Sequence, residues 1–303
     1  MFDFPPREGD GGVEFLAPST WADALAARSE HPGAVPIAGG TDVMVELNFD
    51  RHRPDVLIDL TRVSELGQWS RGDDGGIRLG AGVTFARVMT ELAEHAPGLA
   101  MASRTVGSPQ IRVRGTVGGN LGSASPAGDA HPVLLAIDAV VEVESVRGVR
   151  QVPVADFFTG VKKSALEPDE LISAVLLPPV AGPQQFAKIG TRNAMVIAVT
   201  SFGLALHPQR QAIGAAIGSA APTPRHARTA EQFLAAALAE DGLWDSRAEV
   251  PDAVATRFGD LVAADASPID DVRGTAAYRR HALSVLARRT LGWAWQDYRR
   301  EAA

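Results

Sequence analysis

Two segments rich in glycine limit how this chain can fold. The first is PIAGGTDV at residues 36–43, and the second is GTVGGNLGSASPAGD at residues 115–129. Each follows apolar or extended sequence, contains a Gly-Gly pair and carries an aspartate close to the expected start of a helix. Because glycine has no side chain with which to fill a core, these segments leave a space that something else must occupy. We therefore treat them as candidate walls of a binding site.

The residue types in both segments favour an anionic ligand. Consecutive N–H groups in a glycine-rich turn form a nest that binds anions, and a helix N-terminus strengthens it. Thr41, Thr116 and Asn120 add polar side chains beside the glycines. Two such nests predict a grip on a pyrophosphate from both sides, and hence a dinucleotide. The alternative is that each Gly-Gly pair is an ordinary turn, with Ser123 and Ser125 as simple loop hydroxyls.

Common nucleotide and hydrolase motifs do not account for these segments. The chain has no G-x-x-x-x-G-K-[ST] sequence, which excludes a P-loop. GAGVTF at residues 80–85 has Phe85 where the dinucleotide fingerprint G-x-G-x-x-G needs its third glycine. SASPA does not match the nucleophile elbow G-x-S-x-G. A Rossmann site is therefore unsupported.

Composition narrows the function classes further. With 303 residues, 46% of them hydrophobic and 21% charged, the chain is typical of a soluble globular protein with two or three domains. Its formal net charge of −7 argues against nucleic acid as the main partner. The absence of cysteine excludes disulfides, thiolate zinc sites, cysteine-ligated iron–sulfur clusters and a cysteine nucleophile in this chain.

The sequence gives no sign of membrane insertion or secretion. The first residues, MFDFPPREGDGG, lack the basic start and apolar run of a signal peptide. No run of about 18 apolar residues occurs, so we expect no membrane span. A cytoplasmic location is the simplest expectation.

Hydrophobic patterning predicts an α+β chain with a change of character near residue 180. Helices are predicted over 19–33, 42–47, 84–95 and 131–139, with Thr20 and Thr84 as caps, and strands over 34–38, 55–60, 76–82, 139–145 and 170–178. PPVAGP at 178–183 is the expected linker. Strands are then predicted over 184–192, 197–206 and 211–221, and helices over about 225–240, 250–264 and 275–300. In the last helix, Leu283, Leu286, Thr290 and Trp293 are expected near one face.

Longer segments of the chain resemble one known family. They are PIAGGTDVMVE, IRVRGTVGGNLGSASPAGDAHPVLLAIDA, FFTGVKKSALEPDELI, FAKIGTRNAMVIAV, GSAAPTPRHARTAEQFL and RGTAAYRRHALSVLARRTL. The chain resembles the FAD-binding (medium) subunit of molybdenum hydroxylases, the xanthine dehydrogenase and carbon monoxide dehydrogenase family. The similarity covers nearly the whole chain, and the C-terminal segments look most like those of bacterial xanthine dehydrogenases. The second glycine segment is the most specific part of the match.

The resemblance implies a fold and a domain division. It implies a two-part FAD-binding domain of the vanillyl-alcohol oxidase (PCMH) type over residues 1–178, and a smaller α+β C-terminal domain over residues 184–303.

The resemblance also implies cofactor-binding residues. The first segment is expected along the FAD diphosphate and ribityl region, Thr116 to Asn120 as a second clamp, and Gly107 against the cofactor. Asp129 is expected to hydrogen-bond a cofactor hydroxyl or ring group, Ile172 to contact the adenine end, and Lys188 to lie near the flavin as a cation. For Ile172 the alternative is a core strand residue, and for Lys188 a solvated strand end. The full set is Pro36, Ile37, Ala38, Gly39, Gly40, Thr41, Asp42, Val43, Gly107, Thr116, Val117, Gly118, Gly119, Asn120, Asp129, Ile172 and Lys188.

One departure concerns how FAD is held. Some related flavoproteins attach FAD through a histidine in the first segment. Here that segment contains no histidine, and the chain has no cysteine, so we expect noncovalent FAD. His131 follows the second segment closely, but we expect it to be a capping or solvent-exposed group and not an attachment point.

Family membership implies an oxidoreductase component without catalytic acid–base residues or a metal site of its own. Electrons are expected to pass from the molybdenum cofactor of a large partner subunit, through [2Fe–2S] clusters of a small one, to this FAD and on to NAD+. A dimer of heterotrimers is the expected assembly. Four aromatic residues are candidates for partner contacts or for the domain core: Tyr278, Trp293, Trp295 and Tyr298, with the core favoured for Trp293. Two basic residues, Arg112 and Arg114, either face the iron–sulfur subunit or brace the second segment.

Three alternatives remain open at this point. The same subunit in a complex that oxidises carbon monoxide, an aldehyde or an N-heterocycle fits the sequence equally well. A nucleotide-binding regulatory protein without redox function is opposed by the intact glycine segments. A single-chain flavin oxidoreductase is opposed by the lack of a recognisable substrate domain with an acid–base pair.

Overall fold

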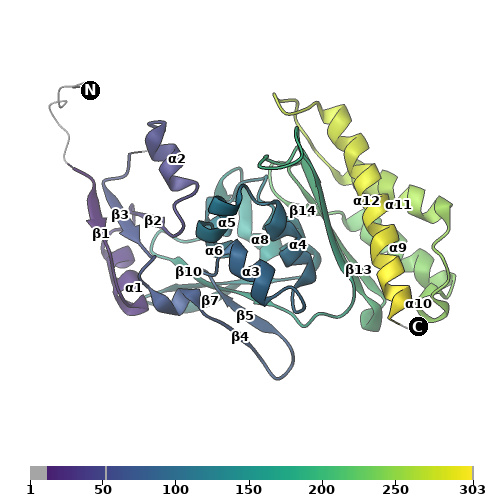
Figure 1. The fold of residues 1–303 in the computed structure, drawn as a ribbon, viewed down its shortest axis with the longest axis horizontal. Helices are drawn as coiled ribbons and strands as arrows, with labels where there is room; N and C mark the ends of the chain where they lie inside the picture. The colour runs from purple at the N-terminus through teal and green to yellow at the C-terminus, as the bar shows by residue number, and fades with distance from the viewer. Residues whose placement is uncertain (1–11, 52, 302–303) are drawn as a thin grey trace.

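The computed structural model describes residues 12–51 and 53–301. Its N-terminal part begins with a small sheet of three parallel strands in the order β1–β3–β2. The elements of this part are β1 (Glu14–Leu16), α1 (Trp21–Glu30), β2 (Val35–Ile37), α2 (Val43–Asn48) and β3 (Val56–Asp59). The Thr20 hydroxyl accepts a hydrogen bond from the Asp23 N–H and caps α1, as the sequence predicts. The first glycine segment runs from β2 into α2 (Figure 1).

A second sheet of five antiparallel strands follows, in the order β4–β5–β10–β6–β7. Its strands are β4 (Trp69–Arg71), β5 (Ile77–Gly80), β6 (Val140–Ser145), β7 (Gly148–Pro153) and β10 (Leu171–Leu177). In β6, Val141 and Val143 are fully buried while Glu142 and Glu144 are partly exposed, so the predicted alternation is confirmed.

A group of short helices follows. They are α3 (Phe85–Glu91), α4 (Pro97–Thr105), α5 (Pro109–Arg114), α6 (Val117–Ser123), α7 (Ala130–Ala136) and α8 (Val154–Phe157), and the small elements η1 (Ser64–Gly67), β8 (Phe158–Gly160) and β9 (Lys163–Ser164) complete this part. Of these helices, α6 contacts β10, and α8 contacts β6 and β7. The second glycine segment, which we expected to be a loop, therefore forms α6 and the turns on either side of it. Thr84 caps α3 as predicted.

The C-terminal part is built on a third sheet, with four antiparallel strands in the order β11–β12–β13–β14. Its elements are β11 (Gln184–Ile189), β12 (Thr200–His207), η2 (Pro208–Arg210), β13 (Ala212–Gly218), β14 (Arg225–His226), α9 (Arg228–Glu240), α10 (Leu243–Ser246), α11 (Asp252–Asp265) and α12 (Ala276–Arg300). This strand-then-helix order confirms the predicted α+β class. The predicted linker at 178–183 joins β10 to β11.

The two faces of this third sheet differ in side-chain size. Phe202, Leu204 and Leu206 of β12 are buried in a hydrophobic cluster with α9, α11 and α12. On the other face, α4 and α7 cover the sheet, as Figure 1 shows by the position of β13 between the two groups of helices. A Cβ atom on Gly214 would lie 1.8 Å from the Ala136 carbonyl oxygen, and one on Gly203 would lie 2.6 Å from that of Pro132. These glycines let α7 lie directly on the sheet.

The aromatic residues of α12 divide differently from our expectation. Trp295 and Tyr298 are buried in the C-terminal core, where their rings pack on Trp244. Trp293 was expected on the buried face, but its exposed fraction is 45%, and that of Tyr278 is 47%. Leu283, Leu286 and Thr290 are buried as predicted.

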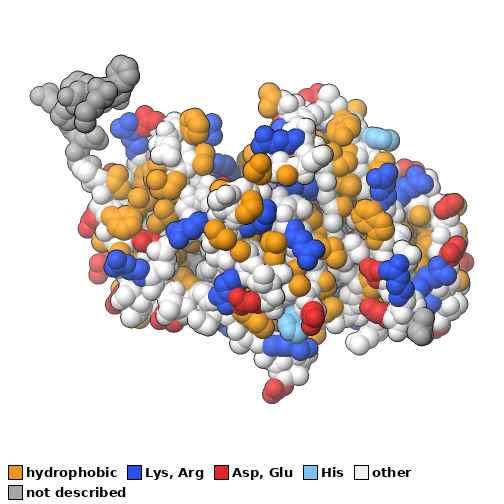
Figure 2. Space-filling model, in the orientation of Figure 1, with side chains coloured by type: hydrophobic (Ala, Val, Ile, Leu, Met, Phe, Trp, Pro, Cys, Tyr) orange, Lys and Arg blue, Asp and Glu red, His pale blue; other side chains and the backbone are white. Residues whose placement is uncertain are grey.

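The described residues show mixed surface charge and no helix that could span a membrane. On the face shown in Figure 2, basic and acidic side chains are interspersed. No helix in residues 12–51 and 53–301 combines the length and hydropathy that a membrane span requires. Residues 1–11, which hold most of the segment compared with a signal peptide, lie outside the described residues.

Candidate functional site

The two glycine segments lie against each other, backbone to backbone. A Cβ atom on Gly39 would lie 1.9 Å from the Arg114 carbonyl oxygen and 2.9 Å from the Gly115 nitrogen, so no larger residue fits at this contact. Gly40 next to it has a φ of +74°, a conformation that favours glycine. The Ser123 hydroxyl donates a hydrogen bond of 2.6 Å to the Asp42 carboxylate and ties the far end of α6 to the first segment.

Backbone N–H groups of the second segment are already used within the chain. Val117 and Gly118 donate to the carbonyls of Val83 and Ala81, at 3.2 and 3.0 Å. The N–H groups of Gly119 and Asn120 donate to the hydroxyl and the carbonyl of Thr116, at 2.9 and 3.0 Å. The expected anion nest is therefore absent over residues 117–120, and Thr116 is instead the cap of α6. Gly118 serves packing, because a Cβ there would lie 2.4 Å from that of Ala81.

In the first segment the N–H groups remain free. Among the described residues, those of Gly39, Gly40 and Thr41 have no hydrogen-bond acceptor. The segment is only partly buried, so a ligand can reach these groups. Of the two predicted nests, only the first keeps N–H groups available for an anion.

Asp129 and Lys188 form a buried ion pair that joins the two parts of the chain. The Lys188 Nζ lies 2.6 Å from Asp129 Oδ2 and also donates to the carbonyl oxygens of Thr105 and Val196, at 2.9 and 3.1 Å. The exposed fraction of each of the two charged side chains is below a tenth, so Lys188 is not a solvated strand end. Burial raises the pKa of the Asp129 carboxyl above its ordinary value, and the Lys188 ammonium opposes that shift.

Two buried side-chain oxygen atoms, one in this pair and one in the second glycine segment, lack donors. Asp129 Oδ2 also accepts a hydrogen bond from the Thr105 hydroxyl at 3.1 Å, but Oδ1 of the same carboxylate is buried without a partner. The side-chain oxygen Oδ1 of Asn120 is likewise buried and unpartnered. Buried acceptors are rarely left without donors, so both positions point to a group that brings N–H or O–H donors.

Gly107 and Arg112 shape the turn between α4 and α5. Gly107 has a φ of +43°, and a Cβ there would lie 2.8 Å from the Ile111 side chain. Arg112 Nη1 donates to the carbonyl oxygens of Arg104, Val106 and Gly107. Arg112 therefore braces the turn before α5 and not the second glycine segment, while Arg114 is exposed at the end of α5.

Ile172 lies within β10, on the sheet below α6. Its exposed fraction is 9%, and a Cβ added to Gly122 would be 3.8 Å from its Cδ1 atom. The residue thus packs as a core strand residue under the helix that carries Asn120.

The environment of His131, like that of Trp293, differs from our prediction. We expected the histidine to be a cap or exposed to solvent, but it is fully buried in α7. Its Nε2 lies 3.1 Å from the carbonyl oxygen of Asn120, and its ring packs on Phe158 with 4.5 Å between ring centroids. Burial lowers the pKa of the imidazole from 6.5 to about 4. The entirely apolar run PVLLA that follows it was the signal of burial.

This shift predicts a pH dependence of stability. Between pH 6.5 and about 4 the unfolded chain binds a proton at His131 that the folded chain does not, so acidification through this window destabilises the fold. The full effect is about 3 kcal/mol at about 1.4 kcal/mol per pKa unit. We expect urea unfolding at pH 7 and pH 4 to show the His131→Gln variant gaining that amount relative to the unsubstituted chain. A difference between the two chains that stays constant with pH contradicts a neutral buried imidazole.

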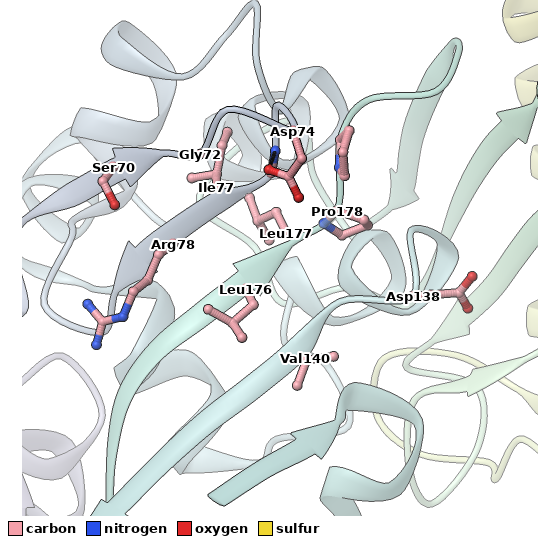
Figure 3. A pocket seen from close by; sticks show the side chains of 12 residues that line it. Ser70, Gly72, Asp74, Ile77, Arg78, Asp138, Val140, Leu176, Leu177 and Pro178 are labelled. Carbon is pink, nitrogen blue, oxygen red and sulfur yellow. Dashed lines mark hydrogen bonds between the residues drawn. The ribbon is translucent and has the colours of Figure 1, made fainter. Parts of the chain in front are cut away.

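An open pocket on the outer face of the five-stranded sheet is unrelated to these residues. It has a volume of about 480 Å³ and lies at the edge formed by β5, β10 and β6 (Figure 3). Arg78, Asp138, Val140 and Leu176 are among its lining residues. None of the predicted site residues lines it.

Comparison with known proteins identifies the family. Residues 11–180 match the model of the FAD binding domain in molybdopterin dehydrogenase, and residues 185–294 match that of the CO dehydrogenase flavoprotein C-terminal domain. The chain belongs to the family of FAD-binding subunits of molybdenum hydroxylases. It is thus an oxidoreductase component, with an FAD-binding domain in two parts and a smaller α+β C-terminal domain.

Individual relatives agree with this assignment. The nicotinate dehydrogenase FAD-subunit of Eubacterium barkeri is 35% identical over 240 residues, which cover 74% of this chain and 80% of that protein. The putative xanthine dehydrogenase FAD-binding subunit of Escherichia coli K12 is 30% identical over 302 residues and 96% of each chain. The solved structure of quinoline 2-oxidoreductase from Pseudomonas putida 86 has a TM-score of 0.85 at 25% identity, covering 98% of this chain and 100% of that one.

The residues present fit FAD. Its diphosphate oxygens need donors, and the N–H groups of Gly39, Gly40 and Thr41 are donors without an acceptor in the described residues. Its ribityl hydroxyls and ring N–H groups need acceptors, and the side-chain oxygens Oδ1 of Asn120 and Asp129 are acceptors without a donor. The first segment has no histidine, and the chain has no cysteine, which fits a cofactor held without a covalent bond there.

Proposed function

We propose that this chain is the electron-transfer FAD subunit of a xanthine dehydrogenase-like molybdenum hydroxylase, passing electrons from [2Fe–2S] clusters to NAD+. The observation that carries the proposal is the contact between the two glycine segments beside the unpartnered buried oxygens of Asn120 and Asp129. The match with a xanthine dehydrogenase FAD-binding subunit over 96% of both chains supports the choice of complex.

Different residues of the chain bind different parts of the cofactor. Residues 36–43 line the diphosphate and ribityl region, where the N–H groups of the first segment bind phosphate oxygens. Residues 116–120 form the second wall through their side chains and close packing, since their N–H groups are occupied. Asp129 accepts from a cofactor donor through Oδ1, and Lys188 holds that carboxylate in place through the ion pair. Gly107 lies against the cofactor, and Ile172 supports its adenine end.

Bound FAD supplies the ability to take up electrons singly and to release them as a pair. The chain's own residues need only bind and orient it. This role requires no catalytic acid–base residues, and the resemblance implies none. Because the chain has no cysteine, the [2Fe–2S] clusters belong to a small partner subunit and the molybdenum cofactor to a large one. We propose a dimer of such heterotrimers.

We propose two domains, at residues 1–178 and 184–303, of which residues 1–11, 52 and 302–303 lie outside the described part. Two hydrophobic clusters support the division: one consists of residues of the first range together with Phe186, Ala205 and Ala216, and the other consists of residues of the second range alone. The helix α7 crosses between them, because it belongs to the first range and packs on β12 and β13 of the second.

A second candidate is the same subunit in a complex that hydroxylates an N-heterocycle. The 35% identity with a nicotinate dehydrogenase FAD-subunit favours it. The identity of the copurifying large subunit and the substrate that reduces the flavin in the purified complex distinguish the two candidates.

The first test is the cofactor itself. We expect the purified chain to show a flavin absorbance spectrum and to release FAD into the supernatant on acid precipitation, with the mass of FAD. In the purified complex, NADH should bleach the flavin band, and NAD+ should restore it after reduction by substrate. A colourless chain that takes up no added FAD, alone or in the complex, contradicts the proposal. Reoxidation only by oxygen or a quinone contradicts NAD+ as the acceptor.

A further inference from the structure

The carbonyl of Asn120 lacks its usual helical partner. In a regular α-helix it accepts from the N–H four residues later, which is that of Ala124. Here the Ala124 N–H donates to the Leu121 carbonyl at 2.9 Å, and Ala124 itself is left-handed, with a φ of +45°. The Ala124 N–H therefore makes no hydrogen bond of regular geometry to the Asn120 carbonyl oxygen.

His131 supplies the missing donor from a different helix. Its Nε2 lies 3.1 Å from the Asn120 oxygen, and since a carbonyl only accepts, this nitrogen carries the hydrogen. The other ring nitrogen, Nδ1, is buried and makes no hydrogen bond of regular geometry, although the Ser125 backbone lies close enough to affect the pKa of the imidazole. Burial keeps the ring neutral above a pKa of about 4. The imidazole thus acts at neutral pH as a single directed N–H donor.

The surroundings fix this ring in one position. Phe158 packs on it at 4.5 Å between centroids, and a Cβ atom on Gly128 would lie 2.2 Å from its Cε1 atom. Gly128 therefore leaves the space that the ring fills. The donor cannot turn away from Asn120 without displacing one of these neighbours.

We propose that His131 is a positioning residue for FAD, which holds the backbone of Asn120 so that the Asn120 side-chain oxygen faces the cofactor. This inference rests on the proposed function, because it assumes that Asn120 contacts FAD. One residue carries both groups: its carbonyl is fixed by His131, and its Oδ1 is buried and awaits a donor. The N-terminal end of α6 is held separately, by Thr116 and by Gly118 on Ala81. The other end is held by the His131 contact to the Asn120 carbonyl and by the Ser123–Asp42 hydrogen bond.

The structure contains a matched control for this role. His207 of β12 is also buried and lies with Nε2 3.2 Å from a helix-end carbonyl, that of Ala136 in α7. Burial lowers the pKa of this histidine too. It makes the same kind of bond, but at the end of α7 remote from Asp129 and from both glycine segments.

The experiment compares full-length chains by titration with FAD, followed by flavin fluorescence and by the position of the visible flavin band. In His131→Gln the amide replaces the N–H donor, while His131→Met has similar length and no donor. We expect His131→Met to bind FAD roughly ten- to hundredfold more weakly with a shifted flavin band, because the Asn120 carbonyl is left buried and unpaired. The FAD affinity of His131→Gln should lie within about threefold of that of the unsubstituted chain. The same holds for His207→Met, even if thermal unfolding shows that this variant is destabilised as much as His131→Met.

Equal FAD binding by His131→Met and His131→Gln overturns the inference, as does an equal loss in His207→Met. If His131→Met does not fold, His131→Leu replaces it in the same comparison. Failure of the unsubstituted chain to bind FAD overturns the proposed function and this inference with it. Binding by the unsubstituted chain together with insensitivity to position 131 overturns only the inference.

Discussion

The Gly39→Ala variant should lose FAD binding by at least about a hundredfold, because the added methyl group has nowhere to go. Its Cβ atom would lie 1.9 Å from the Arg114 carbonyl oxygen and 2.5 Å from the carbonyl carbon. Overpacking against movable side chains already costs about 1–3 kcal/mol, and here the obstacle is backbone at the start of the second segment. The two segments must separate, which destroys a site built between them. Titration with FAD and thermal unfolding of the same preparation measure the two consequences.

Gly122→Ala is the matched control for this substitution. It lies in α6, where a Cβ atom would meet only the Ile172 Cδ1 atom at 3.8 Å, an ordinary contact. Alanine is favoured over glycine inside a helix by about 1 kcal/mol, so this variant should be as stable as the unsubstituted chain or more so. FAD affinity should change little. Unchanged FAD affinity in Gly39→Ala would show that the contact between the segments is not part of the site.

The sequence was sufficient for the first glycine segment but not for the local structure of the second. Residues 36–43 lie in a strand–turn–helix as predicted, because PIA, Gly-Gly and the helix after Asp42 are separated by clear local signals. In the second segment glycines disfavour a helix, and the pattern predicts a loop. The helix α6 forms because Thr116 caps it and because Ala81 packs on Gly118. The cap is local but depends on the exact backbone position of Thr116, and the packing contact joins residues more than 30 positions apart in the chain.

The same limit explains why the predicted pair of anion nests was only half right. Sequence shows which residues carry N–H groups, but not which acceptors reach them. Val83 and Ala81, from the turn before α3, take up two of the N–H groups of the second segment. No local sequence pattern in either segment predicts these two hydrogen bonds.

The error at Trp293 has a simpler cause. Residues along a helix advance by about 100°, so spacings of three and four keep a stripe in phase only when they alternate to an average of 3.6. From Leu283 the stripe reaches Ala294 after about three full turns, whereas Trp293 falls one residue short of it. Ala294 is fully buried and Trp293 is exposed, as this phase requires.

Lys188 and Asp129 were each predicted as residues of the cofactor site, and their bond to each other became visible only in the fold. They are separated by 59 positions in the chain and lie 2.6 Å apart. We expect Lys188→Met to lower the free energy of unfolding by about 3–5 kcal/mol, because it leaves a buried carboxylate unpaired. The pKa of Asp129 should rise further, since the ammonium that opposes the effect of burial is gone. Urea unfolding at pH 7 measures the loss.

The double variant Lys188→Met with Asp129→Asn separates the ion pair from simple packing. Replacing both charges removes the unpaired carboxylate, so it should recover most of the stability that Lys188→Met loses. It should not recover FAD binding to the same extent, because the amide of Asn fills only part of the acceptor role of Asp129 Oδ1 and offers no charge. Recovery of stability and affinity together would mean that Asp129 acts only through the fold. A double variant no more stable than Lys188→Met would instead show that the lysine stabilises the chain through the Thr105 and Val196 carbonyls that it also contacts.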